Sequence, residues 1–261
     1  MERISKTLIK TIYSLSTVKG RREESCFVVE RSKIVLEMLS SQYYLQCLVA
    51  TREWYESHPH INVPDEIRLL ATNADMARMS SLNTPPDVMA VFRLPVYDGS
   101  PYFYKDKLYI ALDRIQDPGN LGTIIRLADW FGVDTILTTY DSVDPFNPKT
   151  IMASMGSIAR VKVIYCPLNH LLENLKGKGM RIWGTFMDGE SIYDIPETIP
   201  PSGIIVMGNE GKGISEKIKQ SLTDRISIPT FPPGHKGAES LNVAMATSII
   251  LSEFRRRSLK N

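Results

Sequence analysis

The stretch Ile204-Ile-Val-Met-Gly-Asn-Glu-Gly-Lys-Gly213 joins an apolar run directly to a glycine-rich loop. The first four residues have the composition of a buried strand, and the last six carry glycines at the spacing G-x-x-G-x-G. This spacing differs from the dinucleotide fingerprint G-x-G-x-x-G, and Ile214 stands where a P-loop has lysine. Glycines at a strand end let main-chain groups approach a ligand, and Glu210 could bind it or accept protons. A plain left-handed turn with solvated Glu210 and Lys212 is the alternative.

Strand-like runs alternate with helical patterns on both sides of this stretch. Strands are predicted at 108–112, 135–139, 160–165, 182–185, 204–207 and 226–228, and helices at 121–131, 148–157, 168–175, 215–222 and 241–256. Such alternation is typical of an α/β fold in which a parallel sheet carries helices on both faces. Ligands of these sheets bind at the carboxyl ends of the strands, so we expect the glycine-rich loop to belong to a binding site.

Two more loops follow predicted strands and carry polar side chains. Residues 113–122 lead into a helix through Asn120 and place Arg126 in its early turns, where helix amides and a guanidinium could receive a phosphate. A Pro-Gly turn with a surface arginine explains the same residues without a function. The other loop opens the last helix; Glu239-Ser240 suits a helix start, but that interpretation leaves Asn242 without a structural reason.

The first 95 residues have the signals of a separate small α/β domain. Strands are predicted at 26–29, 45–49, 67–71 and 88–94, and helical patterns at 34–39 and 74–81. The stretch 95–106 holds two prolines and a glycine and has no helical period, which is typical of a linker. We therefore predict domains at 1–95 and 107–261, joined by a linker at 96–106.

Positive charge is concentrated at the start of the chain. Residues 1–33 carry eight Lys/Arg against four glutamates, although the whole chain has a formal charge of only +2. Lys19, Arg21 and Arg22 in this segment could contact the phosphates of RNA or DNA. A solvated helix face with ordinary basic residues is the alternative.

The overall composition is that of an ordinary folded protein. Of the 261 residues, 43% are hydrophobic and 23% are charged, which argues against a disordered chain, a collagen or a coiled coil. The three cysteines form no CxxC pair, so neither a disulfide scaffold nor structural zinc is supported. His58 and His60 stand in a loop without further ligands, and we expect no metal site. Because no apolar run could span a membrane or form a signal segment, we expect a cytoplasmic protein.

Together, the three loops resemble the signature motifs of the SpoU family, also called TrmH, of RNA ribose methyltransferases. The matching stretches are Pro118-Gly-Asn-Leu-Gly-Thr-Ile-Ile-Arg-Leu-Ala128, Ile205-Val-Met-Gly-Asn-Glu-Gly-Lys-Gly-Ile214, and Ile228-Pro229 with Glu239-Ser-Leu-Asn-Val243. Asp144-Pro-Phe-Asn-Pro-Lys149 and Ala153-Ser-Met-Gly156 are similar to further family segments, so the resemblance runs from about residue 107 to the C-terminus. The segment from Lys19 to Glu30 is similar to the L30e-like substrate-binding domain that often precedes the catalytic domain, although Arg31 stands where glycine is common.

The resemblance implies a SPOUT domain with a deep trefoil knot, S-adenosyl-L-methionine as cofactor, and methyl transfer to a ribose 2′-hydroxyl without a metal. It also implies a homodimer, and the L30e-like domain favours ribosomal RNA over transfer RNA as substrate. The implied cofactor-binding positions are Met207, Gly208, Ile228 and Leu241. The implied polar active-site positions are Asn120, Arg126, Glu210, Ser240 and Asn242.

Arg126 matches the residue to which the family assigns activation of the hydroxyl. A guanidinium keeps its proton at neutral pH and is therefore a poor base, so we expect Arg126 to hold the adjacent RNA phosphate or to stabilise the developing alkoxide, while the other polar residues order the site. A catalytically inactive dimeric RNA-binding scaffold and a base-nitrogen methyltransferase are the alternatives. The scaffold would transfer no methyl group to RNA. The base-nitrogen enzyme would place the methyl group on a base and not on a ribose.

Two features depart from the family pattern. The loop between Pro229 and Glu239 is longer than usual and contains Phe231-Pro-Pro-Gly-His-Lys-Gly237. This insertion could reshape the cofactor lid, contact RNA or be inert. Met152 stands where an arginine is frequent, which predicts a weaker RNA contact at that point.

Overall fold

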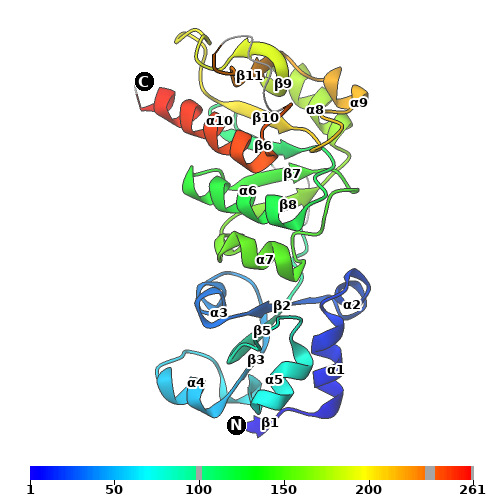
Figure 1. Cartoon of the computed structure of the whole chain (residues 1–261), viewed down its shortest axis with the longest axis vertical. Coiled ribbons are helices and arrows are strands. Elements are labelled where there is room, and N and C mark those ends of the chain that lie inside the picture. The colour runs from blue at the N-terminus through cyan, green and yellow to red at the C-terminus, as the bar shows by residue number, and fades with distance from the viewer. Residues whose placement is uncertain (98–101, 233–238, 260–261) are drawn as a thin grey trace. The chain divides into compact units, whose positions relative to one another are not determined.

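The structure is a computed structural model that describes residues 1–97, 102–232 and 239–259 (Figure 1). The chain forms two compact units: unit 1 comprises Met1–Tyr97 and Asp144–Ala159, and unit 2 comprises Asp98–Val143 and Arg160–Asn261. The sequence division assigned residues 144–159 to the second domain, whereas in the structure this segment packs with unit 1. The predicted lid or RNA contact at Phe231–Gly237 lies mostly outside the described residues.

Unit 1 is built on a mixed five-stranded sheet in the order β1-β4-β3-β5-β2. Its strands are β1 (Glu2–Arg3), β2 (Cys26–Glu30), β3 (Leu45–Ala50), β4 (Arg68–Leu70) and β5 (Val88–Arg93). β1 and β3 run parallel to β4, whereas β5 is antiparallel to β2 and β3. The helices are α1 (Lys6–Ser14), α2 (Val18–Glu24), α3 (Ser32–Leu39), α4 (Arg52–Ser57), α5 (Asn73–Met79) and α7 (Pro148–Ser154), with 3-10 turns at Asp65–Ile67 and Ser157–Ala159.

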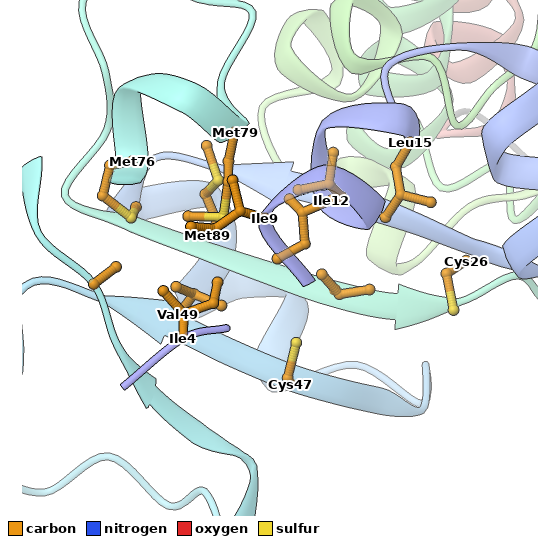
Figure 2. Close-up of a cluster of buried hydrophobic side chains, with 13 residues drawn as sticks. Ile4, Ile9, Ile12, Leu15, Cys26, Cys47, Val49, Met76, Met79 and Met89 are labelled. Carbon is orange, nitrogen blue, oxygen red and sulfur yellow. The ribbon is translucent and has the colours of Figure 1, made fainter. Parts of the chain in front are cut away.

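The helices α1 and α2 were not predicted, because basic residues interrupt the apolar pattern of the first segment. Ser5 caps α1 by accepting a hydrogen bond from the Leu8 amide at 3.2 Å. Ile9 and Ile12 of α1 stand three residues apart, so they share one helix face and are buried against methionines of α5 and β5 (Figure 2). The same cluster takes alternate residues of β2 and β3, which shows that one face of the sheet is covered by α1 and α5.

The segment 144–159 is held in unit 1 by an aromatic contact and an ion pair. Phe146 lies with its ring centroid 4.5 Å from that of Phe27 on β2. Asp144 Oδ2 accepts a hydrogen bond from Arg21 Nε at 2.7 Å, and a second Arg21 nitrogen lies 2.5 Å from the same oxygen. These partners come from segments more than a hundred residues apart in the sequence, so their contact could not be read from sequence order.

Unit 2 is built on a six-stranded sheet in the order β11-β9-β10-β6-β7-β8, in which every neighbouring pair is parallel. The strands are β6 (Leu108–Leu112), β7 (Thr135–Thr138), β8 (Lys162–Tyr165), β9 (Ile182–Ser191), β10 (Gly203–Met207) and β11 (Asp224–Ser227). The helices are α6 (Pro118–Trp130), α8 (Leu168–Gly177), α9 (Glu216–Lys219) and α10 (Val243–Ser258). The predicted parallel α/β architecture is confirmed, although β9 extends well beyond its predicted end and α9 is shorter than predicted.

The helices of unit 2 cover the sheet from two sides. Tyr109 and Ala111 of β6 pack into a cluster with apolar residues of α8 and α9. α6 and α10 lie side by side in the same direction (Figure 1): the Asn242 side chain at the start of α10 bonds Asn120 in the first turn of α6, and Arg255 near the end of α10 bonds the Phe131 carbonyl at 2.6 Å. In the described ranges, none of the helices combines the length and apolar character needed to cross a bilayer.

Candidate active site

Two of the predicted loops leave neighbouring strands at the same level of the unit 2 sheet. Met207, the last residue of β10, is in register with Leu112, the last residue of β6. The Asp113 amide then donates to the Met207 carbonyl at 2.9 Å, so the two loops start side by side. This is the carboxyl edge of the sheet, where the sequence predicted a binding site.

The loop after β10 is a tight hairpin. Asn209 and Gly213 exchange main-chain hydrogen bonds of 3.1 and 2.9 Å, and Asn209 Oδ1 accepts bonds from the amides of Gly211 and Lys212. A Cβ on Gly208 would lie 2.4 Å from the Gly213 carbonyl carbon, a distance that real side chains do not tolerate. Only glycine therefore allows the hairpin to close at Gly208, and this closure presents Glu210 at the exposed tip.

Asn120 joins the three loops through its side chain. Asp117 caps α6 by accepting a bond from the Asn120 amide at 2.7 Å, which fixes Asn120 in the first helical turn. Asn120 Nδ2 donates to Glu210 Oε1 at 3.1 Å, and Asn120 Oδ1 accepts from Asn242 Nδ2 at 3.0 Å. Glu210, Asn120 and Asn242 thus form one hydrogen-bonded row, which we call the polar row.

Asn242 has a structural role that the sequence interpretation missed. Its Oδ1 accepts bonds from the amides of Ala244 at 2.9 Å and Met245 at 3.3 Å, so Asn242, and not Ser240, is the N-cap of α10. Oδ1 of the Asn242 side chain accepts the two capping bonds, and Nδ2 of the same side chain donates to Asn120 in the polar row. One side chain therefore fixes the start of the last helix and ties that helix to Asn120.

Arg126 and Ser240 lie apart from the polar row. Arg126 is exposed on α6, and six residues of helix place it about 120° around the axis from Asn120. Ser240 is exposed in the loop before α10. Within the described ranges, no hydrogen bond or ion pair joins either side chain to Glu210, Asn120 or Asn242. A single copy of the chain thus brings together three of the five predicted polar positions.

The positions expected to bind the cofactor offer main-chain groups and apolar surface. Among the residues that the structure describes, the amides and carbonyls of Gly208, Ile228 and Leu241 have no hydrogen-bond partner. The Leu241 side chain is half exposed and Ile228 is partly buried, whereas Met207 is buried at the strand end. Free donors and acceptors beside apolar side chains fit the adenine and amino-acid ends of S-adenosylmethionine, so the chain has the groups that this cofactor needs.

Sequence reasoning missed Asp113 and Arg114 beneath the site. The Asp113 carboxylate is only 1% exposed and accepts bonds from the Ser215 amide at 2.6 Å and from Arg114 Nε at 3.1 Å. The Arg114 carbonyl accepts from Asn209 Nδ2 at 2.7 Å, and its φ is +60°. Asp113 and Arg114 thus hold the two ends of the Gly208 hairpin, through the Ser215 amide and the Asn209 side chain. An acidic residue directly after the fully apolar strand 108–112 was the available signal.

In the basic segment of unit 1, one of the three predicted phosphate contacts, Arg21, is buried. Arg21 is 1% exposed, and its guanidinium is bonded to Asp144 and to the Leu15 carbonyl at 2.8 Å, so Arg21 is a structural residue and not an available phosphate ligand. Lys19 and Arg22 are exposed and stay candidate RNA contacts.

Among the described residues, no group of three or more His, Cys, Asp or Glu side chains could hold a metal ion.

Comparison with known proteins connects this geometry to one family. The sequence model of the SpoU rRNA Methylase family matches residues 107–252, and that of the MRM3-like substrate binding domain matches residues 6–90. The chain is 29% identical to the 23S rRNA (guanosine(2553)-2′-O)-methyltransferase RlmP of Bacillus subtilis over 95% of both proteins.

Solved structures agree with the sequence comparison. A TrmH-family protein from Porphyromonas gingivalis superposes with a TM-score of 0.85 at 38% identity, covering 97% of this chain and 99% of the other. The rRNA methyltransferase of Sinorhizobium meliloti with bound AdoMet superposes with a TM-score of 0.82 at 27% identity, covering 98% and 97%. With the family model matching more than half of its length, and the family motifs meeting at one edge of its parallel sheet, the chain belongs to the SpoU rRNA methylase family.

Proposed function

We propose that this protein transfers a methyl group from S-adenosylmethionine to a ribose 2′-hydroxyl of RNA. The observation that carries the proposal is the polar row of Glu210, Asn120 and Asn242 at the carboxyl edge of the unit 2 sheet, directly beside the free main-chain groups of Gly208. When bound, the cofactor supplies an electrophilic methyl carbon on a sulfonium. The chain must then position a ribose hydroxyl in line with that carbon, and the proton that the hydroxyl loses passes to the exposed Glu210 carboxylate or to water.

Positioning is the main contribution that the polar row can make. Its hydrogen bonds link the β10 loop, the α6 start and the α10 start, so a ribose held there meets a fixed set of donors and acceptors. Fixed alignment of reacting groups supplies a large part of the barrier reduction in such transfers. The Glu210 carboxylate accepts bonds only, so its exposed oxygens are suited to orient a ribose hydroxyl.

The role of Arg126 in this proposal is electrostatic. A guanidinium donates two parallel bonds to a phosphate and stabilises negative charge that develops on oxygen, without itself gaining or losing a proton. Because Arg126 faces away from the polar row on α6, a second copy of the chain could bring its own Arg126 to the row. Exposed Trp130 on α6 and exposed Met245 on α10 offer apolar surface for such a homodimer.

We assign the two units different tasks, with residues 1–95 binding RNA and residues 107–261 carrying out transfer. The match of residues 6–90 to a substrate binding domain supports this division. We further propose ribosomal RNA over transfer RNA as the substrate. The named activity of the Bacillus subtilis relative on 23S rRNA, at nearly full coverage of both chains, supports that preference.

The test is transfer of radiolabelled methyl from S-adenosylmethionine to unmodified 23S rRNA and, separately, to unmodified tRNA, followed by nuclease digestion. We expect label on ribose of 23S rRNA, a rate lower by roughly 100-fold or more in Arg126→Ala, and a normal rate in Lys217→Ala, which removes an exposed basic side chain on α9. Label on a base would identify a base-nitrogen enzyme. Cofactor and RNA binding without transfer would contradict the proposal in favour of an RNA-binding scaffold.

A further inference from the structure

The exposed ring of Tyr140 is held by a second aromatic ring. Tyr140 is 71% exposed, and its ring is parallel to that of Tyr165 to within 7°, with 6.2 Å between centroids. The Tyr165 hydroxyl donates to the carbonyls of Ser142 at 3.3 Å and Val143 at 2.9 Å. Tyr165 therefore fixes the turn that carries Tyr140 and stacks parallel to its ring, while most of Tyr140 stays in solvent.

The turn that carries Tyr140 is tied to the loop of the candidate active site. The Thr139 hydroxyl accepts from the Arg114 amide at 3.0 Å, and Gln116 Nε2 donates to the Asp141 carbonyl at 2.6 Å. The Val143 amide donates to the Ile115 carbonyl at 2.8 Å. Residues 114–116 lead directly to the cap of α6 that positions Asn120, so Tyr140 belongs to the same carboxyl edge of the sheet as the polar row.

An ordered, exposed aromatic ring beside an RNA-modifying site has a specific use. Proteins recognise RNA sequence mainly at unpaired nucleotides, whose splayed bases stack on aromatic side chains. We propose that Tyr140, held by Tyr165, stacks on an unpaired base of the RNA substrate next to the nucleotide whose ribose is methylated. This inference rests on the proposed function and adds that the substrate presents a single-stranded or flipped nucleotide at the site.

The surroundings of Tyr140 favour RNA over a second copy of the chain. Its neighbours Gln116 and Asp141 are polar and exposed, whereas the large exposed apolar side chains of α6 and α10 are Trp130, at 83%, and Met245, at 54%. Interfaces between identical subunits are richer in apolar area than other surfaces. A lone ring with polar neighbours fits a base, which has an apolar face and polar edges.

The test is a filter-binding titration with an unmodified 23S rRNA transcript as the probe. Wild type is compared with Tyr140→Ala, Tyr140→Phe and Tyr193→Ala, the last removing another exposed tyrosine of unit 2. We expect Tyr140→Ala to bind the transcript about 5- to 150-fold more weakly, and Tyr140→Phe and Tyr193→Ala to bind like wild type. The slope of log affinity against log salt should stay constant in Tyr140→Ala, because tyrosine neutralises no phosphate.

Calorimetry with S-adenosylmethionine and urea unfolding check that each variant keeps its cofactor site and its fold. Unchanged RNA affinity in Tyr140→Ala, or an equal loss in Tyr140→Phe, overturns the proposal, as does wild type that does not bind the transcript. Unchanged affinity together with an altered oligomeric state would show that the ring is a subunit contact. Failure of methyl transfer by wild type contradicts the proposed function alone, because the titration measures binding without turnover.

Discussion

At the scale of single residues, Gly208 shows how closely the candidate site is packed. We expect Gly208→Ala to lose measurable S-adenosylmethionine binding in calorimetry, because the new Cβ would lie 2.4 Å from main-chain atoms of the closed hairpin. Gly211→Ala is the matched control: its nearest contact, Asn209 Oδ1 at 3.9 Å, is an ordinary one. Equal affinities of the two variants would show that the cofactor does not depend on the hairpin.

Glu30 predicts a dependence of stability on pH. It is buried at the end of β2 and accepts a hydrogen bond from the Ser80 hydroxyl. Burial raises the pKa of Glu30, and the Ser80 bond and Arg31 offset the rise only in part. The folded state therefore holds this proton more tightly than the unfolded state, so the contribution of Glu30 to stability is lost as pH rises from the unfolded pKa through the raised folded pKa.

We accordingly expect Glu30→Gln to raise the urea midpoint at pH 7, since glutamine carries no charge to desolvate. Below about pH 4 the difference from wild type should vanish, because the carboxyl is protonated in both states. Glu24→Gln, an exposed position in unit 1, should change neither value. A midpoint at pH 7 lower in Glu30→Gln than in wild type would contradict the assigned cause.

At the scale of elements, two substitutions of Asn242 distinguish its role as the cap of α10 from its role in the polar row. Asn242→Ala should lower the free energy of unfolding by about 1 kcal/mol and also reduce turnover. Asn242→Asp keeps an oxygen for the amides of Ala244 and Met245 and places negative charge at a helix start, so stability should be retained. It cannot donate to Asn120, so its turnover should fall with that of Asn242→Ala. Wild-type turnover in Asn242→Asp would show that this donor is dispensable.

The strands and loops of unit 2 were predictable because they obey local rules. The apolar run 204–207, for example, ends at Gly208, and the motif that follows it has a fixed spacing. The extension of β9 was not predictable, because residues 186–191 include aspartate, glycine and glutamate, which indicate a turn, and only pairing with β11 makes them a strand. The polar row itself was predicted as a set of residues, but its geometry depends on α6 and α10 lying in the same direction.

At the scale of the whole molecule, the Arg21–Asp144 pair predicts how the segment 144–159 is retained. Asp144→Ala leaves the buried Arg21 guanidinium without its counter-charge, which should cost about 3–5 kcal/mol of unfolding free energy. Arg22→Ala, on the exposed side of the same helix, should change stability by less than about 0.5 kcal/mol. Urea unfolding measures both, and equal effects would show that the ion pair does not hold the segment.

The burial of Arg21 and the pairing of α6 with α10 depend on contacts between distant segments, so the sequence could not show them. Arg21 and Arg22 are adjacent and chemically identical, but Arg21 is buried and bonds the distant Asp144 and the Leu15 carbonyl, whereas Arg22 is exposed. Helix geometry alone separates Arg126 from Asn120 around α6, but only packing against α10 decides that Asn120 is the one that meets Asn242. The trefoil knot implied by the family stays a prediction, because strand order and pairing alone do not describe how the chain is threaded.

The polar row finally has a consequence for folding kinetics. Glu210 and Asn242 are 90 and 122 residues from Asn120 along the chain, and contacts of such sequence separation form slowly, above all in parallel sheets. Local helices and short strands can appear early without creating any part of this row. During refolding from urea, methyl transfer should therefore return with the slowest native phase, later than helical circular dichroism, so that catalysis itself reports completion of the fold.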